Sequence, residues 1–219
     1  MIYYSFFQDS LTDESLNKKI NITEICDYYF LSILNTGDLK SKMHPECKLL
    51  YEAVQRYVQT GKVSKTTNKC INFLMKVIAS KIPHDIINAE YSYKPLMGKD
   101  EDWGGLINIL VNDNILVDTV YTKSPFRNEQ DLLDYYRLKL GLEYYLLGIE
   151  NKEGYLMHIS FKTAVRTRLI TGVYSNAQCK KIVDTYMSNK KDLRRADISL
   201  KDICSYEYCK NKQMQYLPV

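Results

Sequence analysis

The residues best suited to catalysis or metal binding lie in the middle third of this chain. Lys139 and Glu143 lie four residues apart in a stretch with helical periodicity, so they share one face of the expected helix. Asp118 lies in an alternating stretch, where residues two apart share a face, so it points the same way as Val120 and Thr122. Carboxylates suit hard divalent cations, whereas an exposed Lys–Glu pair would contribute only about a few tenths of a kcal/mol. A surface pair, a buried structural pair and a functional pair all remain open for Lys139 and Glu143.

Two basic clusters lie in the last third of the chain. One comprises Lys162, Arg166 and Arg168, and the other comprises Lys190, Lys191, Arg194 and Arg195. Such clusters can contact phosphates, although surface lysines are commonly just solvated. The formal net charge of +4 is too small to decide between the two. We therefore expect these residues to be candidates for nucleic-acid binding.

The elements that must position these residues begin with a helical first half. Apolar residues at helical spacing predict helices over 22–35, 45–60 and 68–81, with Pro45 opening the second and Gly61 following it. The middle alternates like strands over 87–96, 104–111 and 115–122, the last two joined by Asn112-Asp113-Asn114. A helix over 128–148, a strand over 155–161 and a helix over 175–189 follow.

This order predicts an α/β fold in which helices flank a central mixed sheet, formed by an antiparallel meander and a further strand. The absence of a linker or repeat in the sequence predicts one domain over 1–219. Its expected parts are a helical region over 1–85, an α/β core over 86–165 and a basic helical region over 166–219.

Three segments carry a resemblance to a known family. Gly105-Leu106-Ile107-Asn108 is similar to a Gly-x-(Ile/Val)-Asp strand, and Asp118-Thr119-Val120 is similar to an Asp/Glu-x-Lys strand. The segment 139–143 is similar to a helix that reads Gln-Leu-x-Leu-Tyr. Together they resemble the RecB-like branch of the PD-(D/E)XK nuclease superfamily over roughly residues 22–161. The resemblance implies a restriction-endonuclease-like core and DNA as the partner.

At the site, the resemblance implies metal-assisted phosphodiester hydrolysis with Mg²⁺ or Mn²⁺. The implied catalytic residues are Asp118, Glu143, Lys139 and Glu90, and the implied metal ligands are Asp118, Glu143, Asn108 and His44. The sequence departs from the family at Asn108, which replaces an aspartate, and at Val120, which replaces the lysine. Lys139 and Glu143 could restore both groups from the neighbouring helix, a migration that is known in the superfamily.

Three functions follow from these departures. The first is a nucleic-acid-binding protein of nuclease fold that is impaired in cleavage and serves as an accessory or structural subunit in DNA processing. The second is an active Mg²⁺-dependent deoxyribonuclease that uses the migrated Lys139 and Glu143. The third is a protein-interaction scaffold that does not bind nucleic acid.

Composition sets the remaining expectations. Six cysteines without a CxxC pair favour reduced thiols, and the spacing of Cys204 and Cys209 differs from that of relatives with an iron–sulphur cluster, so no cluster is expected. No apolar run of about eighteen residues occurs, and the order of charge at the N-terminus is unlike a secretory signal, so we expect an intracellular protein, cytoplasmic or nuclear. Nineteen tyrosines with frequent Asn and Lys suggest a viral or phage origin, and homo-oligomers or protein partners remain open.

Overall fold

Two mixed β-sheets form the centre of the fold in a computed structural model, which describes residues 20–30, 45–63, 65–99, 102–122, 129–160 and 164–195. The smaller sheet has the order β1-β3-β2, with β1 at Ile20–Asn21, β3 at Trp103–Ile107 and β2 at Lys94–Met97. The larger sheet has the order β4-β5-β6-β7. Its strands are Ile109–Val111, Ile115–Thr122, Glu153–Ser160 and Ala164–Thr171. The expected α/β class with a central mixed sheet is therefore confirmed.

The larger sheet is built from a hairpin and a crossover. β4 and β5 are antiparallel, and Asn112 and Asp113 in the turn between them have φ of 49° and 59°, a region that asparagine and aspartate tolerate better than most residues. β5 and β6 are parallel, which requires a crossover connection, and the helix α5 at Glu129–Leu147 provides it. β7 returns antiparallel to β6. The turn and the long helix agree with the sequence-based expectation.

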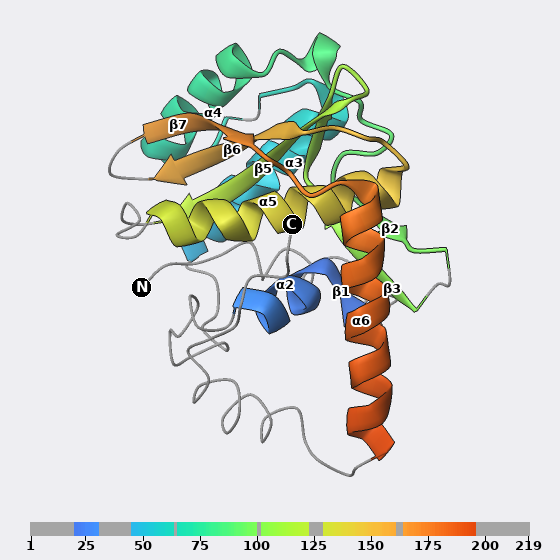
Figure 1. The fold of residues 1–219 in the computed structure, drawn as a ribbon. Helices are drawn as coiled ribbons and strands as arrows, with labels where there is room; N and C mark the ends of the chain where they lie inside the picture. The colour runs from blue at the N-terminus through green and yellow to red at the C-terminus, as the bar shows by residue number, and fades with distance from the viewer. Residues whose placement is uncertain are drawn as a thin grey trace.

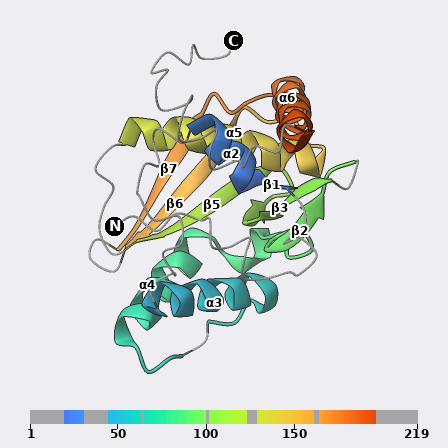
Figure 2. The same ribbon diagram turned by 90° about the horizontal axis from the view of Figure 1, so that it is seen from below.

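Helices cover both faces of this sheet (Figures 1 and 2). α3 at Pro45–Thr60 and α4 at Lys69–Lys81 lie on one side, whereas α5 and α6 at Asn176–Arg195 lie on the other. α2 at Ile22–Phe30 also lies on the α5 side. Each side has its own apolar core: Val120 and Leu140 belong to the core under α5, and Leu74 and Met157 belong to the core under α3 and α4. Within β5, Val120 points into the first core and its neighbour Tyr121 into the second, as strand alternation requires.

A bulge at Asn108 separates β3 from β4. The backbone N–H of Tyr93 donates to the carbonyl oxygens of both Ile107 and Asn108, at 2.7 and 2.9 Å, so one residue faces two on the bulged strand. The side chains of Ile107 and Ile109, two residues apart, consequently lie in different cores. The expected continuous strand over 104–111 is thus wrong, because the chain passes from one sheet to the other at Asn108.

The expected strand over 87–96 is also wrong for most of its length. Residues 84–86 form a 3₁₀ helix, and only Lys94–Met97 pair as a strand. The cause is local: the side-chain oxygen of Asn88 accepts from the N–H groups of Glu90 and Tyr91, which stabilises a turn in place of extended chain. β7, which the sequence did not predict, is an edge strand of the described sheet, and most of its side chains are exposed.

The predicted helices over 45–60, 68–81, 128–148 and 175–189 and the strand over 155–161 are confirmed in place and type, although α6 extends to Arg195. The helix predicted over 22–35 is confirmed as far as Phe30, and residues 31–35 lie outside the described residues. Gly105 in β3 has a specific packing role, because a side chain there would collide with Ile22 of α2. This glycine lets α2 lie directly on the smaller sheet. Among the described residues, no helix combines the length and the apolar character needed to cross a bilayer.

Candidate functional site

A buried lysine joins two carboxylates between β5 and α5. The Lys139 Nζ lies 2.5 Å from Asp118 Oδ2 and 3.0 Å from Glu143 Oε1. Their side chains are 3%, 0% and 1% exposed, respectively. Leu116 and Val120, which flank Asp118 at a spacing of two, lie in the core under α5, so strand alternation aims Asp118 at that helix. These three residues are called the buried cluster below.

Of the three alternatives for Lys139 and Glu143, the surface ion pair is therefore excluded, whereas a structural and a functional pair both remain open. The helix that carries them is apolar on most of its circumference, with Tyr135, Leu138 and Leu142 also buried. The ammonium lies 5.9 Å from the centre of the Tyr136 ring, close enough for a cation–π contact. With one cation and two carboxylates, the buried cluster has a formal charge of −1. Taking such charges out of water is unfavourable unless they pair. The contacts of Lys139 with both carboxylates therefore offset the cost of burying the three charges.

Asn108, where the two sheets diverge, is connected to Asp118 through Thr119. The β4–β5 register begins where Ile109 pairs with Val117, so Asn108 directly precedes the first paired residue of β4. Thr119 makes the connection, because its hydroxyl donates to Asn108 Oδ1 at 2.9 Å and its N–H donates to Asp118 Oδ1 at 2.8 Å. Asn108 is 1% exposed, and its Nδ2 has no hydrogen-bond partner among the described residues. Asn108 is thus linked to Asp118 through Thr119, and its amide nitrogen remains a spare buried polar atom.

A second polar layer continues from Thr119 through the sheet. The Tyr93 hydroxyl lies 3.3 Å from the Thr119 hydroxyl and 3.2 Å from that of Tyr121. Burial raises the pKa of Tyr93 and of Tyr121, and the charge of Asp118 adds to the shift in the same direction. Both phenols stay neutral near pH 7 and can therefore donate hydrogen bonds. Tyr93 also holds the Asn108 bulge through its N–H, so it contacts this region twice.

Of the other predicted catalytic and metal residues, Glu90 is described and lies away from the cluster. Glu90 lies on the exposed turn that precedes β2. His44 lies outside the described residues. In the ranges that the structure describes, no three His, Cys, Asp or Glu side chains gather in a way that could hold a metal ion. Asp118 and Glu143 are the two carboxylates that come together.

The predicted nucleic-acid-binding residues are distributed over two elements. Arg166 and Arg168 are exposed on the edge strand β7, on the same sheet face as Asp118, because Arg168 pairs with Leu156, which pairs with Asp118. Lys190, Arg194 and Arg195 belong to α6, and Lys162 lies outside the described residues.

Sequence reasoning missed Thr119 and Tyr93. Alternation alone would have turned Thr119 away from the Asp118 face, and it is the bulge at Asn108 that brings an acceptor within its reach. Tyr93 lies in a turn, in a segment where the sequence predicted a strand over 87–96. Its φ of 53°, unusual for a bulky residue, is visible only in the structure.

The donor set of the cluster fits a hard divalent cation in its chemistry. Asp118 and Glu143 offer carboxylate oxygens, which Mg²⁺ and Mn²⁺ prefer. The Asn108 amide can take either of two orientations, since the Thr119 hydroxyl can donate to its oxygen or accept from its nitrogen. With its oxygen in the unpartnered position, Asn108 would offer a neutral oxygen as a further ligand. Lys139 would then have to share its carboxylates with the ion.

No family model matches the chain, and no curated protein matches it in sequence. Three solved structures are similar in fold at low identity. An alkaline exonuclease from Laribacter hongkongensis shares 9% identity over 85% of this chain and 98% of its own, with a TM-score of 0.42. A candidate exonuclease from Eubacterium rectale shares 12% over 95% and 93%, with a TM-score of 0.47. The protein SSO0001 shares 11% over 81% and 77%, with a TM-score of 0.44. With scores below 0.5, these likenesses assign neither a family nor an activity to this chain.

Proposed function

We propose that this chain is a metal-dependent deoxyribonuclease related to the RecB-like PD-(D/E)XK enzymes, with its lysine and second carboxylate supplied by α5. The observation that carries the proposal is the contact of Lys139 Nζ with both Asp118 and Glu143 in a buried setting. The strand position at which the resemblance expects a lysine is occupied by Val120, and the α5 ammonium reaches the same carboxylate from the helix.

Each residue of the cluster has a role in this proposal. Asp118 and Glu143 would hold the ion, and Asn108 would add a neutral ligand. The metal, when bound, would polarise the phosphate and lower the pKa of a bound water. Lys139 can donate up to three hydrogen bonds, so it can orient that water or a phosphate oxygen while retaining one carboxylate contact. The surrounding apolar core lowers the local dielectric, which strengthens every one of these charge interactions.

Cleavage of fluorescently labelled single- and double-stranded DNA in Mg²⁺ or Mn²⁺ tests the proposal. Wild-type protein should cut only with metal present, and Lys139→Met should lower the rate by about 10²–10⁴-fold, the usual contribution of a group that handles a proton. Lys139→Arg keeps the charge and controls for loss of folding. Lys48→Met, at an exposed Lys48–Glu52 pair, is the matched control and should cut like wild type. Metal-dependent cutting that survives Asp118→Ala would contradict the assignment.

A second candidate is a nucleic-acid-binding accessory subunit that does not cleave. It is favoured by Asn108 in place of an acidic ligand and by the near-complete burial of the cluster, whose carboxylates already pair with Lys139. In that case wild-type protein should bind DNA in EDTA and leave it intact in both metals. Asn108→Asp, which adds the missing carboxylate, should then create weak metal-dependent cutting. A protein that shows neither binding nor cutting would instead fit the scaffold hypothesis.

A further inference from the structure

The positive charge of the chain is concentrated in one segment. Residues 53–84 contain six basic residues and no acidic residue, which leaves 24 basic and 26 acidic residues in the rest of the chain. The net charge of +4 therefore arises from this segment alone. The six are Arg56, Lys62, Lys65, Lys69, Lys76 and Lys81.

This segment is the hairpin of α3 and α4. Arg56 is on α3, Lys62 and Lys65 are on the connection, and the other three lysines are on α4. All six side chains are exposed. The two helices lie on the side of the larger sheet away from α5, with α4 at the outer surface of the molecule (Figure 2). The hairpin thus presents a basic surface that is separate from the buried cluster.

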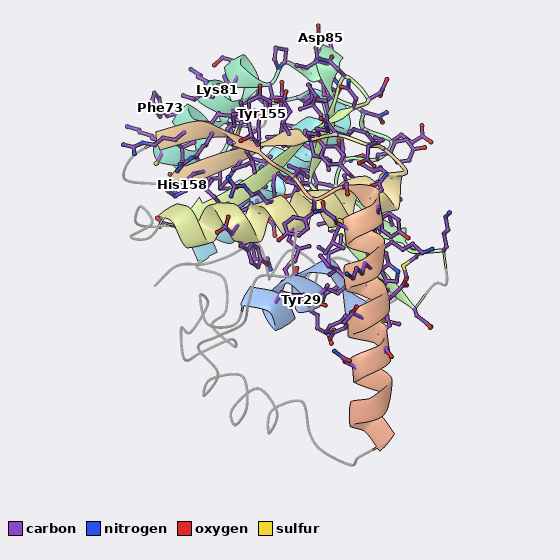
Figure 3. The ribbon with its side chains drawn as sticks, viewed as in Figure 1. Tyr29, Phe73, Lys81, Asp85, Tyr155 and His158 are labelled. Atoms are coloured by element: carbon purple, nitrogen blue, oxygen red, sulfur yellow. The ribbon has the colours of Figure 1, made fainter. Side chains whose placement is uncertain are left out.

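An exposed aromatic ring lies within the basic surface. Lys69, Phe73, Lys76 and Ser80 follow one another at spacings of four, three and four, so they form one stripe along α4. The opposite stripe, with Ile71, Leu74 and Ile78, is buried against the sheet. Phe73 is 58% exposed, more than any other large hydrophobic residue of the described chain. Figure 3 shows its side chain on the outer side of α4.

We propose that the α3–α4 hairpin is a binding surface for single-stranded nucleic acid. Lys69 and Lys76 are seven residues apart, or about 10 Å along the helix, with Phe73 between them. Lysines at that separation can contact successive phosphates, and the ring can stack on an intervening base. A duplex keeps its bases stacked inside, so the stripe fits an unpaired strand better. An anionic membrane or an acidic protein would use the lysines but would have no base to place on Phe73.

This surface does not depend on whether the buried cluster cuts. The larger sheet lies between α4 and α5, so a strand bound on α4 is held on the opposite side from Lys139 (Figure 2). The hairpin would therefore hold nucleic acid in a non-cleaving accessory protein and in a nuclease alike. In a nuclease it would hold a part of the substrate remote from the cut.

Fluorescence anisotropy of a labelled oligothymidylate with the full-length protein in EDTA tests the inference. Lys69→Gln with Lys76→Gln should weaken binding and lower the salt slope of log K by about 1.4, since each single-strand phosphate contact contributes about 0.7. Phe73→Ala should weaken binding roughly tenfold, whereas Phe73→Trp should retain it. Lys180→Gln with Lys181→Gln, at two exposed lysines of α6, is the matched control.

The binding measurements distinguish the α3–α4 hairpin from other candidate binding surfaces and partners. Equal binding by the α4 double variant and the α6 control would overturn the inference, as would Phe73→Ala binding like wild type. Binding of anionic vesicles without binding of the oligonucleotide would assign the surface to a membrane and also overturn it. Preferential binding of a duplex of the same sequence would remove the stacking role. Metal-free conditions keep these outcomes independent of cleavage.

Discussion

At the scale of single residues, the position of Lys139 determines what the cluster can do. Its ammonium is the only basic group of the described chain in contact with Asp118 and Glu143. The sequence correctly places Lys139 and Glu143 on one helix face, because that follows from the helical period alone. It could not tell which way the face points, since α5 is mostly apolar and carries charged residues both on its partly exposed side, at Asp134 and Arg137, and on its buried side. The burial of Lys139 depends on the core under α5, whose residues come from several helices and strands far apart in the sequence.

Removing the lysine charge should strongly destabilise the fold. Lys139→Met leaves Asp118 and Glu143 buried without a cation, and breaking a buried pair in this way costs about 3–5 kcal/mol. The free energy of unfolding from urea titration measures this loss. Lys48→Met removes one partner of an exposed pair, 4.0 Å apart, and should change the free energy of unfolding by less than about 1 kcal/mol.

A matched second variant identifies the cause of that loss. Lys139→Met combined with Glu143→Gln leaves one buried carboxylate in place of two, so it should recover part of the stability. If Lys139→Met were as stable as Lys48→Met, the cluster would be hydrated in solution, and the burial of Lys139, Asp118 and Glu143 described above would be contradicted.

At the scale of elements, the bulge at Asn108 joins the two sheets and brings the polar residues together. The sequence predicted β-structure on both sides of it and the hairpin turn after it, because alternation and the Asn-Asp-Asn triplet are local signals. A bulge has no such signal: Ile107 and Ile109 look like neighbours on one face until a partner residue fixes the extra residue between them. That partner is Tyr93, which comes from a turn where a strand was expected.

Tyr93→Phe tests how the bulge positions Asn108. The variant keeps the ring and loses the hydroxyl contacts to Thr119 and Tyr121, so it should lower the free energy of unfolding by about 1 kcal/mol. Without the neighbouring hydroxyl, Thr119 should hold the Asn108 amide less firmly. The side-chain NH₂ signals of Asn108 in NMR spectra should therefore shift and broaden.

Tyr57→Phe is the control for this variant. Tyr57 donates to the carbonyl of Ile82 at 2.9 Å in the core under α3 and α4, so its loss should have a similar effect on stability. It should leave the Asn108 signals in place. Unchanged Asn108 signals in Tyr93→Phe would mean that the backbone bulge alone positions the amide.

At the scale of the whole molecule, the larger sheet separates two environments. One side holds a net negative, buried cluster under α5, and the other holds the basic hairpin of α3 and α4. The sequence contains the charge concentration over 53–84, but its six basic residues are spaced more widely than the basic clusters near the C-terminus. Only the fold shows that six dispersed residues share one exposed hairpin, since α4 turns three of them outward.

If the sheet does separate two independent halves, substitutions on its two sides should have additive effects on stability. Lys139 and Tyr57 lie on opposite sides of the larger sheet and share no hydrogen-bond partner. The changes in the free energy of unfolding caused by Lys139→Met and Tyr57→Phe should therefore be additive within about 0.3–0.5 kcal/mol in a double-mutant cycle. Lys139→Met and Asn108→Ala should not add, because both perturb Asp118, the first directly and the second through Thr119. A coupling energy in the range of about 0.5–3 kcal/mol is expected for that pair. Equal coupling in both cycles would show that the two sides of the sheet respond as one, and the hairpin could then no longer be treated as energetically separate from the buried cluster.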